Sequence, residues 1–279
     1  MPEAQQSTLK TRAAMSGSGL HTGAECGIAL CPAAADSGVV FVTHQGEVRA
    51  ALGDVQDTHR GTSLRSGDAE VHSVEHLLAA LAGMGVDNVR VEVDGPEIPA
   101  GDGSALPFVE LIENAGIEEQ ATDARTIRLE EPVWVAHDGK YLLAVPGSGF
   151  KASALISFRH PMIGEQAISL VIDPATFKRE IAPARTFCFA DEIEAILSQG
   201  LGRGGNEDNV IVVYDDRCSV PLRFENEFVR HKVLDLVGDL SLIGRRLHAD
   251  VTAIKTSHAL NVALADQIMR TEASGWQGG

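Results

Sequence analysis

The sequence predicts an α+β fold, and three observations support this class. Short stretches in which apolar and polar residues alternate, the pattern of half-buried strands, recur throughout the 279 residues. Segments with helical spacing stand in blocks between runs of strands, whereas a doubly wound sheet would alternate the two. A polar segment at residues 118–125 separates two halves of similar length. We therefore expect an N-terminal α+β domain over residues 1–122 and a C-terminal α+β domain over residues 123–279.

The elements follow from the periodicity of the apolar residues. Alternation predicts strands at residues 8–14, 24–31, 38–42, 88–94, 127–135, 141–145, 152–158, 167–172, 210–214 and 251–254. Apolar residues three and four apart predict helices at residues 73–83, 106–115, 191–198, 227–243 and 258–269. Two predicted helices share a sequence pattern: His76 and His231 are each followed seven positions later by a glycine, Gly83 and Gly238. This shared pattern indicates two related layers that each contribute one histidine, or else chance agreement between two amphipathic helices.

Composition limits the partners. With 44% apolar and 22% charged residues, the chain is a folded globular protein. A formal charge of −16 argues against a nucleic-acid partner, since such binding depends on clustered Lys and Arg. The first twenty residues lack the apolar core of a secretory signal, and the apolar stretch at 77–86 is too short to span a bilayer. We expect a cytoplasmic monomer without a transmembrane segment, in which the four cysteines are reduced, buried thiols.

Two separated segments could supply a metal site. His231 and Asp235 are four positions apart, so a helix places both side chains on one face, although such pairs are more often surface pairs. A second histidine, His76, stands near the start of another predicted helix. A catalytic zinc needs about three protein ligands and one open position, and these residues would provide the three.

Neighbouring ionisable residues could supply acid–base chemistry. Glu75 could accept a proton from metal-bound water, or could instead be a first-turn carboxylate stabilised by the helix dipole. His258 stands between a predicted strand and helix, where active-site side chains are common, but a capping or packing role is the alternative. Asp239, two helical turns after His231, could hold a nearby imidazole protonated.

Six separated motifs resemble, in the same order, the UDP-3-O-acyl-N-acetylglucosamine deacetylase family. This family catalyses the committed step of lipid A synthesis in Gram-negative bacteria. The resemblance extends from about residue 8 to residue 269. The motifs are Gly19-Leu-His-Thr-Gly23, Ser73-Val-Glu-His-Leu77, residues 96–108, Ala184-Arg-Thr-Phe187, residues 222–235 and residues 255–261.

The resemblance implies a fold and a set of roles. The fold is two layered β-α-α-β domains packed face to face, with the active site between them. His76, His231 and Asp235 become the ligands of one catalytic Zn²⁺, with Fe²⁺ as the alternative in the cell. Glu75 becomes the general base, and His258 becomes the positively charged acid that Asp239 orients. Further matches are Thr186 at the carbonyl oxygen, and Phe187 and Lys232 near the sugar and diphosphate of an acylated UDP-N-acetylglucosamine substrate.

The expected function is metal-assisted hydrolysis of the N-acetyl group of that substrate. Residues 167–215 are rich in apolar side chains and would form a β-α-β insert, either lining a passage for the acyl chain or serving as ordinary core. His72 stands where the family carries a small hydroxyl residue, and we favour a packing or capping role for it over metal binding. A catalytically silent protein that binds the UDP-sugar and its acyl chain, with a regulatory role on the same fold, is the alternative function.

Overall fold

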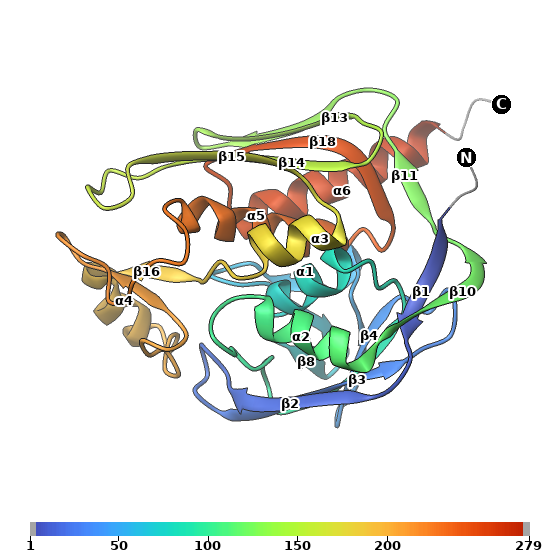
Figure 1. Ribbon diagram of the computed structural model, residues 1–279, viewed down its shortest axis with the longest axis horizontal. Helices are drawn as coiled ribbons and strands as arrows, with labels where there is room; N and C mark the ends of the chain where they lie inside the picture. The colour runs from blue at the N-terminus through green and yellow to red at the C-terminus, as the bar shows by residue number, and fades with distance from the viewer. Residues whose placement is uncertain (1–3, 276–279) are drawn as a thin grey trace.

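The computed structural model describes residues 4–275, which form four layers with a sheet on each outer side and helices between them (Figure 1). The strands bury the side chains that alternation predicts: in β9 (Val89–Asp94) every second residue is buried, beginning with Val89. Helices cover the inner faces of both sheets, so the apolar core lies between the sheets. The predicted α+β class, with two layered halves face to face, is confirmed.

The N-terminal sheet has the strand order β2-β3-β9-β4-β5. The central strand β9 pairs antiparallel with β3 and parallel with β4. A smaller sheet of β6, β7 and β8 packs beside β4 and β5. The bounds are β2 (Ala13–Ser18), β3 (Glu25–Pro32), β4 (Val39–Thr43), β5 (Gly46–Arg49), β6 (Val55–Asp57), β7 (Ser63–Ser66) and β8 (Ala69–Val71).

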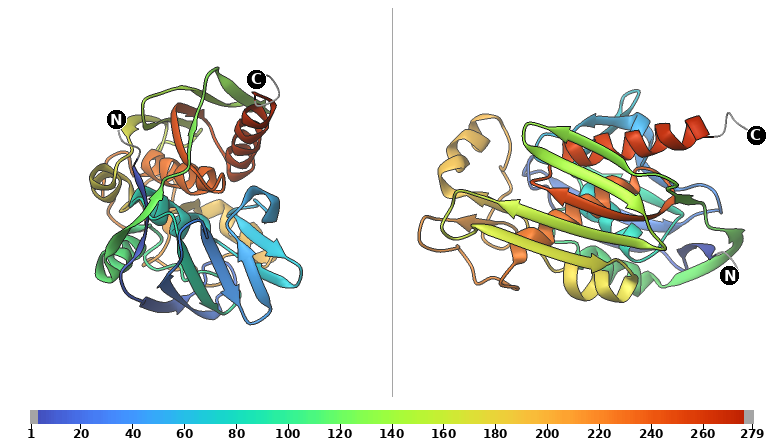
Figure 2. Two further views of the ribbon diagram at one scale, coloured as in Figure 1. Left: turned by 90° about the vertical axis from the view of Figure 1, so that its right-hand side faces the viewer. Right: turned by 90° about the horizontal axis from the view of Figure 1, so that it is seen from above.

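The C-terminal sheet has the strand order β12-β13-β18-β14-β15, and β11 pairs with the first residues of β18. The central strand β18 is antiparallel to β13 and parallel to β14. Helices pack on its inner face, and its outer face is open in the view from above (Figure 2). The bounds are β11 (Thr126–Arg128), β12 (Val133–His137), β13 (Lys140–Pro146), β14 (Phe150–Ser157), β15 (Glu165–Val171) and β18 (Arg246–Ile254).

The helices form the two inner layers. α1 (Glu75–Gly83) and α2 (Leu106–Ala115) lie on the N-terminal sheet, whereas α5 (Glu227–Ser241) and α6 (His258–Gly275) lie on the C-terminal sheet (Figure 1). Each predicted helix is present, and α2 has the predicted bounds. A helical segment that was not predicted, α3 (Pro174–Thr176), continues into the turn Phe177–Ile181. Asp173 begins it, because its carboxylate accepts a hydrogen bond from Thr176 N at 2.8 Å.

The two helices that share the histidine-to-glycine spacing, α1 and α5, contact each other at the centre of the molecule. Gly238 allows this contact, because a Cβ atom there would lie 2.1 Å from the carbonyl oxygen of Glu75. Gly83 plays the same part at another contact, where a Cβ atom would lie 2.3 Å from the ring of Phe177. The absence of side chains at both glycines therefore sets how closely the layers approach.

Strands that change partner account for two differences from the predicted elements. One strand was expected over residues 8–14, but β1 (Gln5–Leu9) ends before β2 begins, since β1 pairs with β10 (Ile117–Asp123) and β2 with β3. The segment at 127–135 divides in the same way, into β11 on β18 and β12 on β13. The predicted domain boundary after residue 122 falls within β10, and the division into two domains stays a prediction.

The predicted insert contains a small β-α-β unit at one end of the molecule (Figure 1). β16 (Phe187–Phe189) and β17 (Ile211–Val213) pair in parallel, and α4 (Ile193–Ser198) lies between them in the sequence. The first part of the predicted insert, residues 167–171, belongs to β15 of the C-terminal sheet instead. Two short 3-10 turns, Leu52–Asp54 and Ala190–Glu192, complete the elements of the described chain.

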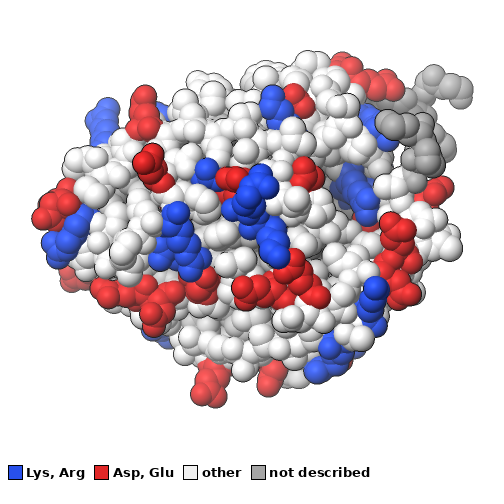
Figure 3. Space-filling view, viewed as in Figure 1, with Lys and Arg blue, Asp and Glu red and all other residues white. Residues whose placement is uncertain are grey.

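Surface properties agree with the composition. On the face in Figure 3, basic side chains are scattered among acidic ones. Over residues 4–275, no helix has both the length and the apolar character needed to cross a bilayer. The four cysteines are free thiols, but only Cys26 is buried; Cys31, Cys188 and Cys218 are partly exposed, so the prediction that all four are buried is wrong.

Candidate metal centre and active site

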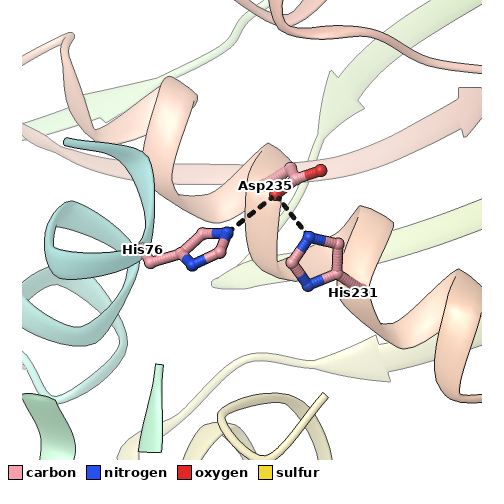
Figure 4. A group of neighbouring side chains, drawn as sticks. All are labelled: His76, His231 and Asp235. Atoms are coloured by element: carbon pink, nitrogen blue, oxygen red, sulfur yellow. Dashed lines mark ion pairs between the residues drawn. The ribbon is translucent and has the colours of Figure 1, made fainter. Parts of the chain in front are cut away.

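The contact between α1 and α5 brings the three predicted metal ligands together. His76 extends from α1, and His231 and Asp235 extend from adjacent turns of α5, so that all three point to one place (Figure 4). Asp235 Oδ1 lies 3.3 Å from His231 Nε2 and 3.7 Å from His76 Nε2, and the potential ligand atoms all lie within 4.8 Å of one another. Two donors about 2.1 Å from a tetrahedral ion would be about 3.4 Å apart. The spacing therefore fits one ion.

The hydrogen bonds around the three residues also fit a metal. Asp235 Oδ1 is buried and has no hydrogen-bond partner among the described residues, which is costly for a carboxylate unless a cation binds it. His231 Nδ1 lies 3.1 Å from the carbonyl oxygen of Ala184. A carbonyl can only accept, so the proton is on Nδ1 and the lone pair of Nε2 is free to bind a metal.

Burial and charge set the protonation of this group. Burial, assisted by the neighbouring His76 and Lys232, outweighs the opposing charge of Asp235 and lowers the pKa of His231 to about 3, so the imidazole of His231 is neutral at pH 7. Burial opposes ionisation of Asp235, but the adjacent imidazole of His231 and the positive charges of Lys232 and His258 outweigh it and hold the pKa of Asp235 well below its usual range. A neutral imidazole and an ionised carboxylate are the forms that bind divalent metals.

Glu75 lies directly beside this group, in the first turn of α1. Its side chain is buried and accepts a hydrogen bond from the backbone N–H of Thr62 at Oε2, over 2.9 Å. On the other carboxylate oxygen there is little space, because a Cβ atom at Gly61 would lie 3.1 Å from Oε1. The carboxylate is thus held in one orientation.

His258 begins α6 and reaches the same site from the other side. Its Nδ1 donates to Asp239 Oδ2 at 2.8 Å, and its Nε2 lies 3.9 Å from Asp235 Oδ2. Burial alone would lower the pKa of His258, but the carboxylates of Asp239 and Asp235 outweigh it and raise the pKa to about 10. His258 is therefore a cation at neutral pH, as an acid must be.

Thr186, Phe187 and Lys232 form a further wall. The backbone of Thr186 bonds on both sides, its N–H donating to Gly103 O and its carbonyl accepting from Ile211 N. Phe187 packs edge-on against Phe228, with ring centroids 4.8 Å apart, and also contacts the ring of His231. Lys232 Nζ donates to Asp235 Oδ2 at 2.8 Å and lies 5.7 Å from the centre of the Phe187 ring.

A cavity of about 390 Å³ joins these side chains. Every predicted site residue lines it except Asp239, which is fully buried behind His258. Two non-glycine residues that line the cavity, Arg60 and Ser73, have positive φ angles of 61° and 58°, and Lys255, which precedes the lining residue Thr256, has a φ of 56°. Such backbone conformations are costly and often occur at functional sites. Here Ser73 lies two residues before Glu75, the first residue of α1.

Glu97 was not singled out from the sequence, although it connects two motifs of the site. Its buried carboxylate accepts hydrogen bonds from the backbone N–H groups of His21 and Thr22. It also accepts from the hydroxyls of Thr22 and Ser73, both at 2.7 Å. Burial opposes its ionisation, but these four donors outweigh burial and lower the pKa of Glu97. A glutamate in a proline-flanked apolar stretch was the signal that could have found it.

A buried ion pair, also not predicted, holds the segment before β16, which contains Thr186, on α5. Arg185 Nε lies 2.8 Å from Glu227 Oε1, and its second terminal nitrogen lies 3.1 Å from Oε2. Two parallel bonds of this kind fix the relative orientation of both partners. His72, by contrast, lies outside the metal group, and its ring bonds Ser63 Oγ at 2.9 Å.

Comparison with known proteins identifies the family. Residues 6–270 match the model of the UDP-3-O-acyl N-acetylglycosamine deacetylase family. The UDP-3-O-acyl-N-acetylglucosamine deacetylase of Anaeromyxobacter sp. (strain Fw109-5) is 45% identical over 95% of this chain and 88% of its own length. The enzyme of the same name from Myxococcus xanthus (strain DK1622) is 43% identical over 95% of this chain and 86% of its own. The enzyme of the same name from Thioalkalivibrio sulfidiphilus (strain HL-EbGR7) is 42% identical over 98% of this chain and 92% of its own length. The chain belongs to the UDP-3-O-acyl-N-acetylglucosamine deacetylase family.

Proposed function

We propose that this chain hydrolyses the N-acetyl group of UDP-3-O-acyl-N-acetylglucosamine, giving acetate and the free amine, in lipid A biosynthesis. Family membership supports the reaction and the substrate. The observation that carries the proposal within this chain is the unpartnered buried oxygen of Asp235, which faces two histidines beside a carboxylate and a cationic imidazole. These are the groups that metal-assisted amide hydrolysis requires.

We assign the metal to His76, His231 and Asp235. Two imidazole nitrogens and one carboxylate suit Zn²⁺ as three ligands with an open position, and the same donor set suits Fe²⁺. We propose Zn²⁺, with Fe²⁺ as the alternative in the cell. When bound, such an ion polarises a carbonyl oxygen and lowers the pKa of a bound water to about 7.

The acid–base roles follow from the positions of the remaining groups. Glu75, held by the Thr62 N–H, takes the proton from the attacking water. His258, kept cationic by Asp239, stabilises the negative charge that develops on the carbonyl oxygen and then protonates the departing amine. The hydroxyl of Thr186, on the cavity wall, donates a further hydrogen bond to that oxygen.

Substrate contacts are proposed for the part of the cavity wall formed by Phe187 and Lys232. Phe187 would pack on the sugar and Lys232 would interact with the diphosphate, since both line the cavity and carry an aromatic ring and a positive charge, respectively. The β-α-β unit that begins at Phe187 would line the acyl passage. The monomeric state and the cytoplasmic location stay predictions.

Acetate release from the acylated UDP-sugar tests the proposal. The metal-loaded protein should release acetate, a chelator should stop the release, and added Zn²⁺ should restore it. If the loaded protein binds the substrate but releases no acetate, the chain is the silent binding protein that the sequence left as an alternative. Release that survives complete removal of the metal would refute the assignment of a metal centre.

A further inference from the structure

Thr62 is a buried residue between β6 and β7 that bonds the carboxylates of Glu75 and Asp239 without lining the cavity. Its side chain is fully shielded from solvent. Its polar contacts reach Glu75, 13 positions away, and Asp239, 177 positions away. One residue therefore contacts functional groups from both inner helix layers.

The backbone of Thr62 is bound to the start of α1. Its N–H donates to Glu75 Oε2 at 2.9 Å, and its carbonyl oxygen accepts from the N–H of Val74 at 3.0 Å. The first contact orients the proposed base, and the second holds the turn that precedes it. A displacement of the segment around Thr62 would displace the carboxylate of Glu75.

The side chain of Thr62 is bound to the partner of the proposed acid. Its hydroxyl donates to Asp239 Oδ1 at 2.6 Å. The other oxygen, Oδ2, accepts from His258 Nδ1 and from Asn261 Nδ2, each at 2.8 Å. Thr62 is the donor to Oδ1 among residues 4–275, so its hydroxyl fixes the rotation of the Asp239 carboxylate. That rotation sets the direction in which His258 is held.

We infer that Thr62 is a positioning residue that fixes the general base and the general acid relative to each other. The inference rests on the proposed function, since it assumes that Glu75 and His258 act in one reaction. The base lies on α1 and the acid on α6, two helices that are far apart in the sequence. Their alignment therefore needs a direct link through contacts. Thr62 provides that link through its N–H on one side and its hydroxyl on the other.

Valine in place of Thr62 keeps the shape and removes the hydroxyl. Asp239 Oδ1 would then be a buried acceptor without a donor, and the carboxylate could rotate away from His258. Because Thr62 does not line the cavity, substrate binding should be unaffected. For Thr62→Val we expect kcat to fall roughly 10–100-fold with KM and metal content unchanged, the effect of a misplaced catalytic group. Thr62→Ser retains a hydroxyl and should restore most of kcat.

Thr8→Val is the matched control. Thr8 is also a buried threonine, and its hydroxyl donates to Asn88 O at 2.7 Å and accepts from Ala33 N at 2.9 Å, away from the cavity. Both valine variants should lower Tm, because both remove a buried hydroxyl. Only Thr62→Val should lower kcat. Near wild-type kcat in folded Thr62→Val, or no recovery in Thr62→Ser, would show that Thr62 has only a structural role and overturn the inference.

A second measurement separates this inference from the proposed function. In nuclear magnetic resonance spectra of protein with ¹⁵N-labelled histidine, the Nδ1–H signal of His258 reports its bond to Asp239. It should shift or broaden in Thr62→Val, return in Thr62→Ser and stay unchanged in Thr8→Val. An unchanged signal in Thr62→Val refutes the link even if the protein hydrolyses the substrate. If the signal shifts in Thr62→Val but the wild-type protein releases no acetate, the link is supported while the proposed function fails. If Thr62→Val does not fold, kcat and the His258 Nδ1–H signal are measured in Thr62→Ala instead.

Discussion

Replacing Glu97 by glutamine tests how the loop at residues 19–23 is tied to the start of α1. Four donors meet the buried carboxylate: the backbone N–H groups of His21 and Thr22 and the hydroxyls of Thr22 and Ser73. Glutamine keeps the shape but turns one acceptor oxygen into an NH₂ donor. The hydroxyls can rotate to accept from it, whereas the backbone N–H groups cannot. At least one charge-assisted bond is lost and another is weakened.

The structure gives the size and the pH dependence of this change. With about 1.5–3 kcal/mol for a hydrogen bond to a charged group, the free energy of unfolding should fall by about 2–4 kcal/mol at pH 7. The folded protein lowers the pKa of Glu97, so its carboxylate contributes stability above the unfolded value of about 4.3, and this contribution is lost as the pH falls through the folded value. Glutamine does not titrate. The difference between the two proteins should therefore narrow below about pH 4.3.

Urea unfolding followed by circular dichroism at a series of pH values measures both effects. Glu92→Gln is the control, since Glu92 pairs with Arg12 on the surface, where both side chains are about half exposed. That variant should lie within about 0.5 kcal/mol of the wild type. The reasoning is refuted if Glu97→Gln is as stable as the control at pH 7, or if its deficit persists unchanged at acid pH.

Three further predictions concern the site. His76→Ala and His231→Ala should lose bound metal to a similar extent, measured by elemental analysis, because one ion joins two helices; full metal content in the first variant would place the ion on α5 alone. Asp239→Asn removes the charge that raises the pKa of His258, so the alkaline limb of the kcat/KM profile should move to lower pH. If the alkaline limb does not move, it reports the titration of another group or of metal-bound water. Gly238→Ala places a Cβ atom 2.1 Å from a carbonyl oxygen of α1 and should cost about 1–3 kcal/mol and weaken metal binding; wild-type values in urea unfolding and metal titration would contradict the close contact.

Much of the fold could be predicted because local periodicity reflects local burial. α2 has the predicted bounds, and β9 buries every second residue as its alternation requires. The strand at residues 8–14 was predicted as one element because both of its parts alternate, yet the parts pair in different sheets. Pairing partners are distant in the chain, so periodicity carries no information about them. The helical segment from Pro174 did carry a signal, the aspartate and proline at its start, which was overlooked.

The site, like the fold, could be predicted only in part from the sequence. The spacing of His231 and Asp235 indicated a shared helix face, and the six motifs indicated the family and the roles of the site residues. No sequence pattern pointed to Thr62, a threonine between two short strands whose contacts lie 13 and 177 positions away. Arg185 and Glu227 likewise pair across 42 positions.

By itself, the sequence determined which residues can ionise or bind a metal, which faces of strands and helices are apolar and, through its motifs, the family. The tertiary structure decided which of these groups meet and in what state. His231 is neutral because it is buried, and His258 is cationic because two carboxylates reach it in a buried place. Both are histidines with the same intrinsic chemistry. Burial and the distances between charges set their difference, and these arise only when helices from separate halves of the chain pack together.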